Sequence, residues 1–320
     1  MKQKHRTTKR TTSVIVTICL FMVTITTGQD STSNYSKEIS FKTENDAYLL
    51  NLNDAYYTNG FFLNYGWAKQ KANHKKMQSV ELSQMIFTPL NRTATLPVDM
   101  DRTYCGYLSL KYMQTRFQTK HIIQFGGNIG IVGKASGGEW MQNWYHDLIG
   151  FAKFKGWQYQ IANAVGVDIN LSYATNIYNK GLLKLTPVLQ ANLGTLHTNA
   201  KVGMYTVFGV FEKNENSALW NARIDGKTTT RNRHNELFLY WYPQLIAQGY
   251  NATLQGGRGV QNSQQLTQDI APTMFQQAWG LCYAEARWTM RLELVYQSKE
   301  TPAQTKAQRY GVIQLCYRIH

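Results

Sequence analysis

The sequence predicts an all-β protein, an antiparallel transmembrane β-barrel of about 12 strands with one short extracellular helix. Apolar and polar residues alternate with period two along most of the chain, in segments close to the ~9–11 residues that cross a bilayer as a tilted strand. Tyr, Trp and Phe, 13% of the 320 residues, gather at the ends of these segments. A protein with several helical spans is excluded, because each span needs about 20 apolar residues and only one continuously apolar stretch exists.

The composition narrows the alternatives further. Charged residues make up only 17% of the chain and hydrophobic residues 43%, which excludes a disordered protein. The 24 Gly and 6 Pro show no period, which excludes a collagen-like or proline-rich fibre. The mean hydropathy of −0.40 is compatible with a soluble enzyme and with a membrane β-barrel.

The first element, residues 1–28, is predicted to be a secretory signal peptide. A basic segment precedes a short apolar core from Val14 to Val23, and small residues at Thr26 and Gly28 suit cleavage near Gly28. The basic residues are Lys2, Lys4, Arg6, Lys9 and Arg10. Their removal from 34 Lys and Arg leaves 29 against 19 acidic residues, a net charge of +10 that favours polyanions such as a phosphorylated lipid surface.

The mature chain, residues 29–320, is predicted to form a single barrel domain. The strands are expected at 39–47, 56–67, 78–88, 105–117, 121–132, 157–173, 181–194, 201–211, 236–248, 274–284, 287–297 and 309–319. A soluble β-sandwich is the competing interpretation, but its strands would be shorter and carry fewer aromatic residues at their ends. The polar stretches 212–235 and 249–273 are expected to be long surface loops.

One segment departs from the strand pattern. In residues 137–150, Trp140, Trp144 and Leu148 recur at helical spacing between flanking glycines, which predicts a helix near 138–150. A lone helix between barrel strands must lie in a loop, where it could pack across the barrel wall. Aromatic neighbours would then shield His146 from water.

Three cysteines remain after cleavage: Cys105, Cys282 and Cys316. None belongs to a CxxC motif or a Cys/His cluster, so no structural zinc site is expected. They are interpreted as small buried or lipid-facing strand residues, with one disulfide left open. The absence of zinc spacing and of an Arg-rich run also argues against nucleic acid as a partner.

Short polar motifs are the candidates for chemistry, because the sequence has no G-x-S-x-G, H-E-x-x-H, P-loop or EF-hand motif. Asn45 and Asp46, at the end of the first strand, could contribute oxygen ligands to a hard cation, although Asn and Asp also favour plain turns. His146, with Gln142 one turn earlier on the expected helix, could act as a general base toward water.

These motifs together resemble the outer-membrane lipid A 3′-O-deacylase family (LpxR type). The family carries an Asn-Asp pair, a Tyr-Thr-x-Gly motif, an Asp-Arg motif, a glycine-rich segment with Gln and His, and a Trp-x-x-Gln. The matching residues are Asn45-Asp46, Tyr57-Thr58-Asn59-Gly60, Asp101-Arg102, the segment Gly130 to Gly150 with Gln142 and His146, and Trp157 with Gln160. The resemblance is specific over about residues 39–172.

The resemblance implies calcium-dependent hydrolysis of the ester that holds the 3′-acyloxyacyl chain of lipid A, in the outer leaflet of a Gram-negative outer membrane. His146 matches the base that activates water. Asn45 and Asp46 match the polar pair beside the calcium ion (Ca²⁺), and Thr58 matches the hydroxyl residue of the site. We expect a monomer with its active site between barrel wall and helix, facing the cell surface.

Two departures and two alternatives accompany this interpretation. Some family members have Glu six positions after the histidine, where this chain has Ala152, so Asp147 or Glu139 would have to replace it. The chain ends in Arg318-Ile319-His320 rather than in the Phe common among such barrels. A non-catalytic porin-like or structural barrel, and a barrel esterase acting on glycerophospholipid, are the alternative functions.

Overall fold

The computed structural model describes residues 35–49, 56–71, 74–91, 93–118, 120–150, 153–226, 234–260 and 262–320. The expected signal peptide, residues 50–55 and Ala152 lie outside these residues. No helix in the described part of the chain is long and apolar enough to cross a membrane.

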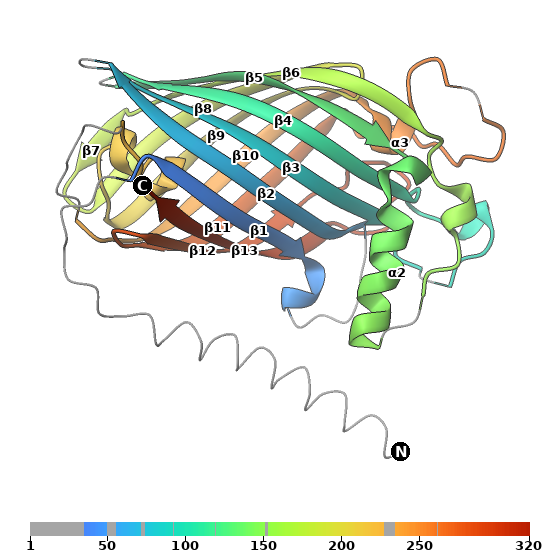
Figure 1. The fold of residues 1–320 in the computed structure, drawn as a ribbon. Helices are drawn as coiled ribbons and strands as arrows, with labels where there is room; N and C mark the ends of the chain where they lie inside the picture. Colours follow the sequence, from blue (N-terminus) through green and yellow to red (C-terminus); the bar gives the residue numbers. More distant parts are fainter. Residues whose placement is uncertain are drawn as a thin grey trace. The chain divides into compact units, whose positions relative to one another are not determined.

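The strands close into an antiparallel barrel (Figure 1), which confirms the predicted fold class. The sheet has 13 strands, and its last member β7 (Tyr178–Lys180) is a short addition that pairs only with β8. β13 pairs with β1 and β6 pairs with β8, so no long edge stays open. The barrel strands are β1 Lys37–Asn45, β2 Tyr56–Lys71, β3 His74–Thr88, β4 Cys105–Phe117, β5 His121–Val132, β6 Ala164–Thr175, β8 Leu183–Gly194, β9 His197–Val210, β10 Glu236–Asn251, β11 Thr273–Ala284, β12 Trp288–Gln297 and β13 Gln308–Ile319.

The alternation in the sequence becomes two different faces of the wall. On β6, Val165, Val167 and Ile169 are exposed, whereas Asp168 and Asn170 between them are buried. Successive strand residues point to opposite sides of a sheet, so the apolar residues cover the outside and the polar residues line the interior. This is the distribution that a barrel surrounded by lipid requires.

The two ends of the barrel differ. Strands at one end are joined by short turns, such as 118–120 and 285–287, apart from the longer segment 211–235. The other end carries long connections that contain most of the short helices. These are η1 Asp46–Leu49, η2 Pro97–Asp99, η3 Lys134–Ser136, α2 Gly138–Ile149, η4 Trp157–Tyr159 and α3 Ala252–Gln255.

The expectation that 212–235 forms a surface loop is wrong for the part that the structure describes. Residues 214–225, with η5 Asn214–Asn216 and η6 Ala218–Trp220, are largely buried and pack in the main apolar cluster of the barrel. The carboxylate of Glu236, the first residue of β10, anchors the segment. It accepts hydrogen bonds from the backbone amides of Glu212 and Ala218 at 2.9 and 2.7 Å and from the Arg223 guanidinium at 2.9 Å.

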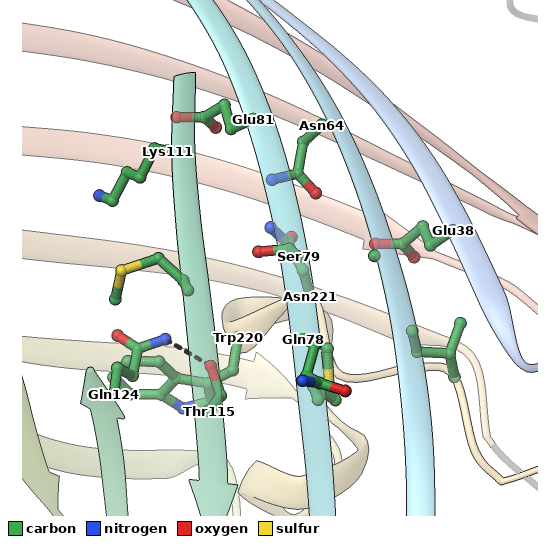
Figure 2. A pocket seen from close by; sticks show the side chains of 14 residues that line it. Glu38, Asn64, Gln78, Ser79, Glu81, Lys111, Thr115, Gln124, Trp220 and Asn221 are labelled. Atoms are coloured by element: carbon green, nitrogen blue, oxygen red, sulfur yellow. Dashed lines mark hydrogen bonds between the residues drawn. The ribbon is translucent and has the colours of Figure 1, made fainter. Parts of the chain in front are cut away.

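A small polar cavity lies beside the inserted segment. Figure 2 shows Trp220 and Asn221 of the segment beside wall residues such as Glu38 and Lys111 around a cavity of about 180 Å³.

The three cysteines Cys105, Cys282 and Cys316 are buried and free, so none of them forms a disulfide. The expected loop 249–273 is corrected as well, because β10 continues to Asn251 and α3 follows with three buried residues.

Candidate active site

A pair of glycines lets α2 lie directly against the barrel wall. A Cβ atom built on Gly106 of β4 would lie 2.8 Å from the Cα of Gly138, the first residue of α2. Gly137 before the helix and Gly150 after it both adopt left-handed φ values, 76° and 77°, which glycine tolerates best. The predicted helix between glycines is therefore confirmed, and the glycine of the wall has a steric purpose.

The helix covers the outer side of the wall. Along β3, the outward-facing Leu82 is 47% exposed, whereas Gln84 and Ile86, which share its orientation, are 6% and 0% exposed. Ile86 packs in a cluster with Tyr104, Phe154 and Trp157, and Met141 of α2 lies against this cluster. A thin layer of protein thus replaces lipid over the ends of β3 and β4.

The two faces of α2 differ sharply in exposure. Trp140, Trp144 and Leu148 are 68%, 53% and 68% exposed, while Gln142 and His146 are 0% and 2% exposed. The two tryptophan rings stack on each other at 6.5 Å instead of shielding the histidine. The polar side chains consequently face the protein, and the apolar stripe faces outward.

Residues that follow the helix hold its polar face in place. Trp157 Nε1 donates a hydrogen bond to Gln142 Oε1 at 3.0 Å, and the Phe154 ring lies 5.4 Å from the His146 ring. Gln160 Nε2 donates to Glu139 Oε2 at 3.3 Å. Both residues of the Trp-x-x-Gln motif therefore bind α2 directly.

Asn45 and Asp46 lie at the end of β1 and are both buried. Asn45 shares the outward orientation of Ile39 and Phe41 on the same strand. Its Oδ1 accepts a hydrogen bond from the Ala47 amide at 2.6 Å, which is the turn geometry that Asn favours, and its Nδ2 donates to Asn59 Oδ1. Asn45 thus forms the turn and contacts a further polar residue on β2.

Thr58 sits in a β-bulge, where Tyr57 pairs with Phe87 but Asn59 pairs with Ile86. The extra residue is fully buried, and its hydroxyl donates to the Ile86 carbonyl at 3.2 Å. Bulges re-aim side chains at the rims of barrels and next to active sites, so this irregularity is typical of a functional position. Sequence patterning alone gave no sign of the bulge.

The strand register connects the two groups of residues. Asn45 lies opposite Asn59, and Asn59 lies opposite Ile86. Ile86 in turn lies opposite Gly106, against which α2 begins. The polar pair on β1 and β2 and the start of the helix therefore occupy one row across four consecutive strands, at the long-loop end of the barrel (Figure 1).

The Asp-Arg motif has a structural task. Asp101 Oδ2 accepts from the Tyr56 hydroxyl at 2.6 Å and its Oδ1 from the Leu90 amide at 3.0 Å. The buried Arg102 forms an ion pair with Glu300 at 2.5 Å. The motif ties together the loops at this end of the barrel, including Tyr56, whose φ of 66° is unusual for a bulky residue.

The oxygen atoms near Asn45 suit calcium in kind. Carboxylate, amide carbonyl and hydroxyl oxygens are the ligands that Ca²⁺ prefers, and Asp46, Asn45, Asn59 and Thr58 offer all three. A carbonyl oxygen has two lone pairs, so the turn bond to Ala47 leaves Asn45 able to bind a second partner. Among the described residues, no group of three or more His, Cys, Asp or Glu gathers into a metal-binding cluster.

Comparison with known proteins identifies the family. The family model of outer membrane protein LpxR matches residues 14–319, which is nearly the whole chain. The chain belongs to the LpxR family. A solved structure of LpxR from Salmonella typhimurium is similar, with 20% sequence identity, a TM-score of 0.73, and coverage of 88% of this chain and 100% of that chain. The β domain of the Bordetella autotransporter BrkA is 8% identical at a TM-score of 0.49, covering 89% of this chain and 98% of that chain.

No curated protein sequence matches this chain. Family membership supports a Gram-negative outer-membrane barrel of the LpxR type.

The two residues expected to replace the family's glutamate, Asp147 and Glu139, have different surroundings. Asp147 is exposed and forms an ion pair with Lys153 at 2.9 Å, whereas Glu139 binds Gln160.

Proposed function

We propose that this LpxR-family protein hydrolyses the ester of the 3′-acyloxyacyl chain of lipid A in the outer leaflet, with His146 as the general base. The observation that carries the proposal is the burial of His146 and Gln142 on the protein-facing side of α2, a helix that contacts β3 and β4 of the barrel wall. A polar, histidine-containing site on the outer side of the wall lies next to the surrounding lipid, from which a substrate approaches laterally. A site in the barrel interior would not be.

The length of α2 supports one site that combines His146 with the polar residues around Asn45. α2 has 12 residues, a length of about 18 Å at ~1.5 Å per residue. The row from β4 to β1 spans three strand spacings, about 14 Å at ~4.8 Å each. A helix of this length that starts at β4 and contacts β3 is therefore long enough to span the distance from β4 to Asn45.

The reaction can be written with these residues. His146 accepts a proton from a water molecule, and the water oxygen forms a bond to the ester carbonyl carbon. The bond between the carbonyl carbon and the sugar oxygen then breaks, and the imidazolium of His146 gives its proton to the departing sugar alkoxide. The hydrogen bond from Trp157 to Gln142 fixes the orientation of the polar face of α2, on which His146 lies.

Asn45, Asp46, Asn59 and Thr58 would hold the calcium ion. A Ca²⁺ ion bound there supplies positive charge next to an ester carbonyl, the chemistry that stabilises an oxyanion. One carboxylate among the four residues favours a weak site, with a dissociation constant on the order of 10⁻⁴–10⁻³ M, because affinity rises with the number of charged ligands.

The porin-like alternative is disfavoured by the barrel interior. Ala218, Ala222 and Ile224 of the inserted segment pack in the main apolar cluster inside the strands, and Arg291 Nη2 donates to the Ala218 carbonyl at 2.6 Å. A channel needs a continuous water-filled lumen. A filled interior instead suits a barrel that works on its outer surface.

Mass spectrometry of lipid A tests the proposal. Cells that produce the protein should contain lipid A lighter by the 3′-acyloxyacyl chain, and cells with the His146→Asn protein should not. Phospholipids from the same cells are the control for the glycerophospholipid alternative. Unchanged lipid A together with deacylated glycerophospholipid would overturn the proposal in favour of that alternative.

A further inference from the structure

A polar cavity of about 510 Å³ lies beside the candidate active site, at the long-loop end of the barrel. Three parts of the chain line it: the start of α2 with η3, the segment 154–163 and the loop 262–265. Its floor is formed by the buried side chains of Phe154, Trp157 and Ile161.

The lining of this cavity has a distinct chemistry. Lys134 and Lys155 are the two cations and Glu139 the one anion among the lining residues. Most of the other polar groups are side-chain amides, which both donate and accept hydrogen bonds. These amides include Gln158, Asn163, Asn262 and Gln264. Amides together with an excess of positive charge suit an anionic saccharide, whereas an acyl chain would need an apolar lining.

The walls of the cavity are cross-linked and therefore preformed. Asn163 Oδ1 accepts from the Ala135 amide at 2.8 Å, which ties the segment 154–163 to η3. Gln265 Oε1 accepts from the Ala162 amide at 2.9 Å, which ties the loop 262–265 to the same segment. A preformed site loses little conformational entropy when a ligand binds.

One lining residue points to a missing partner. Gln160 Oε1 is buried and accepts no hydrogen bond within the protein, although Gln160 Nε2 binds Glu139. A buried acceptor without a donor is unfavourable, so the Gln160 amide gains a hydrogen bond if its side chain turns into the cavity toward the hydroxyl group of a bound sugar.

The cavity shares two walls with the candidate active site. Trp157 lines the cavity and donates to Gln142, while Phe154 lines it and contacts His146. A saccharide in the cavity would thus lie next to the polar face of α2. Its ester-linked chains would extend from there toward the outer side of the barrel wall.

We propose that this cavity binds the anionic saccharide headgroup of the substrate, an inference that rests on the proposed hydrolysis of lipid A. Lys134 and Lys155 bind the anionic group, and the amides and Gln160 bind sugar hydroxyls. The cavity thereby selects a lipid with a charged saccharide over a lipid with a small headgroup.

The double variant Lys134→Ala/Lys155→Ala tests the inference in the full-length protein. We expect its KM for lipid A to rise roughly tenfold with kcat unchanged, because two exposed charge contacts of up to ~1 kcal/mol each are lost. A short-chain nitrophenyl ester, which has no saccharide, should be hydrolysed at the wild-type rate. Lys306→Ala, an exposed lysine at the same end of the barrel that does not line the cavity, is the matched control.

Two further substrates separate the possible anions, phosphate and sugar carboxylate. Lipid A without phosphates and lipid A without acidic sugars are each compared with the intact substrate in the wild type and the double variant. If removing one kind of charged group makes the KM values of the two proteins equal, that group is the anion that Lys134 and Lys155 bind. An unchanged KM in the double variant for every substrate would overturn the inference.

A binding measurement keeps the two proposals apart. The water-soluble saccharide part of the substrate, with both its phosphates and its acidic sugars, should bind the wild type about ten times more tightly than the double variant, as measured by titration calorimetry. Equal binding to both proteins refutes the saccharide cavity. Weaker binding to the variant without hydrolysis of any lipid A by the wild type refutes only the proposed reaction.

Discussion

Gly138 at the start of α2 lies against Gly106 of β4 with no room for a side chain between them. A Cβ atom on Gly106 would meet Ser136 Oγ at 2.2 Å and the Gly138 Cα at 2.8 Å, and real Cβ atoms do not approach backbone so closely. The position of the helix, and with it the position of His146, thus requires glycine at both positions.

This contact gives the first prediction. Gly106→Ala should displace the start of α2 and lower ester hydrolysis by about 10²-fold, because small misplacements of a catalytic group cost rates of that order. Heat-modifiable migration in detergent gels should stay normal, since the strands themselves are unaffected. Gly66→Ala, where the nearest atom would lie at 3.7 Å, is the matched control and should keep full activity.

The second prediction concerns the base. His146→Asn should reduce hydrolysis by about 10²–10⁴-fold, because asparagine cannot accept the proton from water. The initial rate on purified lipid A measures this, with the folded fraction checked by heat-modifiable migration. Asp147→Asn alters the neighbouring exposed residue and should stay close to wild type. Comparable activity of the His146 and Asp147 variants would rule out His146 as the base.

Much of the fold could be predicted because its cause is local. A strand with lipid outside and polar groups inside must alternate along its own sequence, so β4 at 105–117 and β5 at 121–132 begin and end where the alternation does. The segment 157–173 was assigned too early a start, since Trp157–Tyr159 forms η4 and β6 begins at Ala164. The aromatic residues Trp157 and Tyr159 belong to this loop and not to the end of the strand.

What could not be predicted depends on distant partners. The inserted segment reads as a surface loop because it is polar, yet its Arg223 is neutralised by Glu236 inside the barrel. The orientation of α2 also depends on partners outside the helix itself. In a soluble protein an apolar stripe faces the core, but next to a membrane the stripe of Trp140 and Trp144 can face lipid, which leaves the polar face for the protein.

The third prediction concerns the metal. Treatment with EDTA should stop hydrolysis, and Ca²⁺ should restore it better than Zn²⁺, because the oxygen donors around Asn45 suit a hard cation. Millimolar Ca²⁺ should be needed, given the single carboxylate of Asp46. Asp46→Asn should raise the Ca²⁺ concentration for half-maximal activity by at least about tenfold, since it removes the only charged ligand. Full activity in the chelated protein would contradict the calcium mechanism.

The fourth prediction concerns the filled interior. Glu236→Gln leaves the buried Arg223 without its counter-charge, which should lower the free energy of unfolding by about 3–5 kcal/mol. Urea denaturation followed by tryptophan fluorescence measures the change. Glu285→Gln, at the same end but partly exposed, should have little effect. In planar bilayers the wild type should show no ion conductance, and a steady porin-like conductance would favour the channel alternative.

The last prediction concerns orientation, on which access to lipid A depends. Long loops of outer-membrane barrels face the cell exterior and short turns face the periplasm, so α2 should lie on the cell surface. Cys105, Cys282 and Cys316, the cysteines of the described residues, are buried, so a cysteine introduced at an exposed position should be the one that a thiol reagent modifies. Asp147→Cys on α2 should react with a membrane-impermeant maleimide on intact cells. Lys120→Cys, in a short turn at the opposite end, should react only after the outer membrane is permeabilised. The reverse pattern would turn the helix toward the periplasm and remove His146 from the leaflet that holds lipid A.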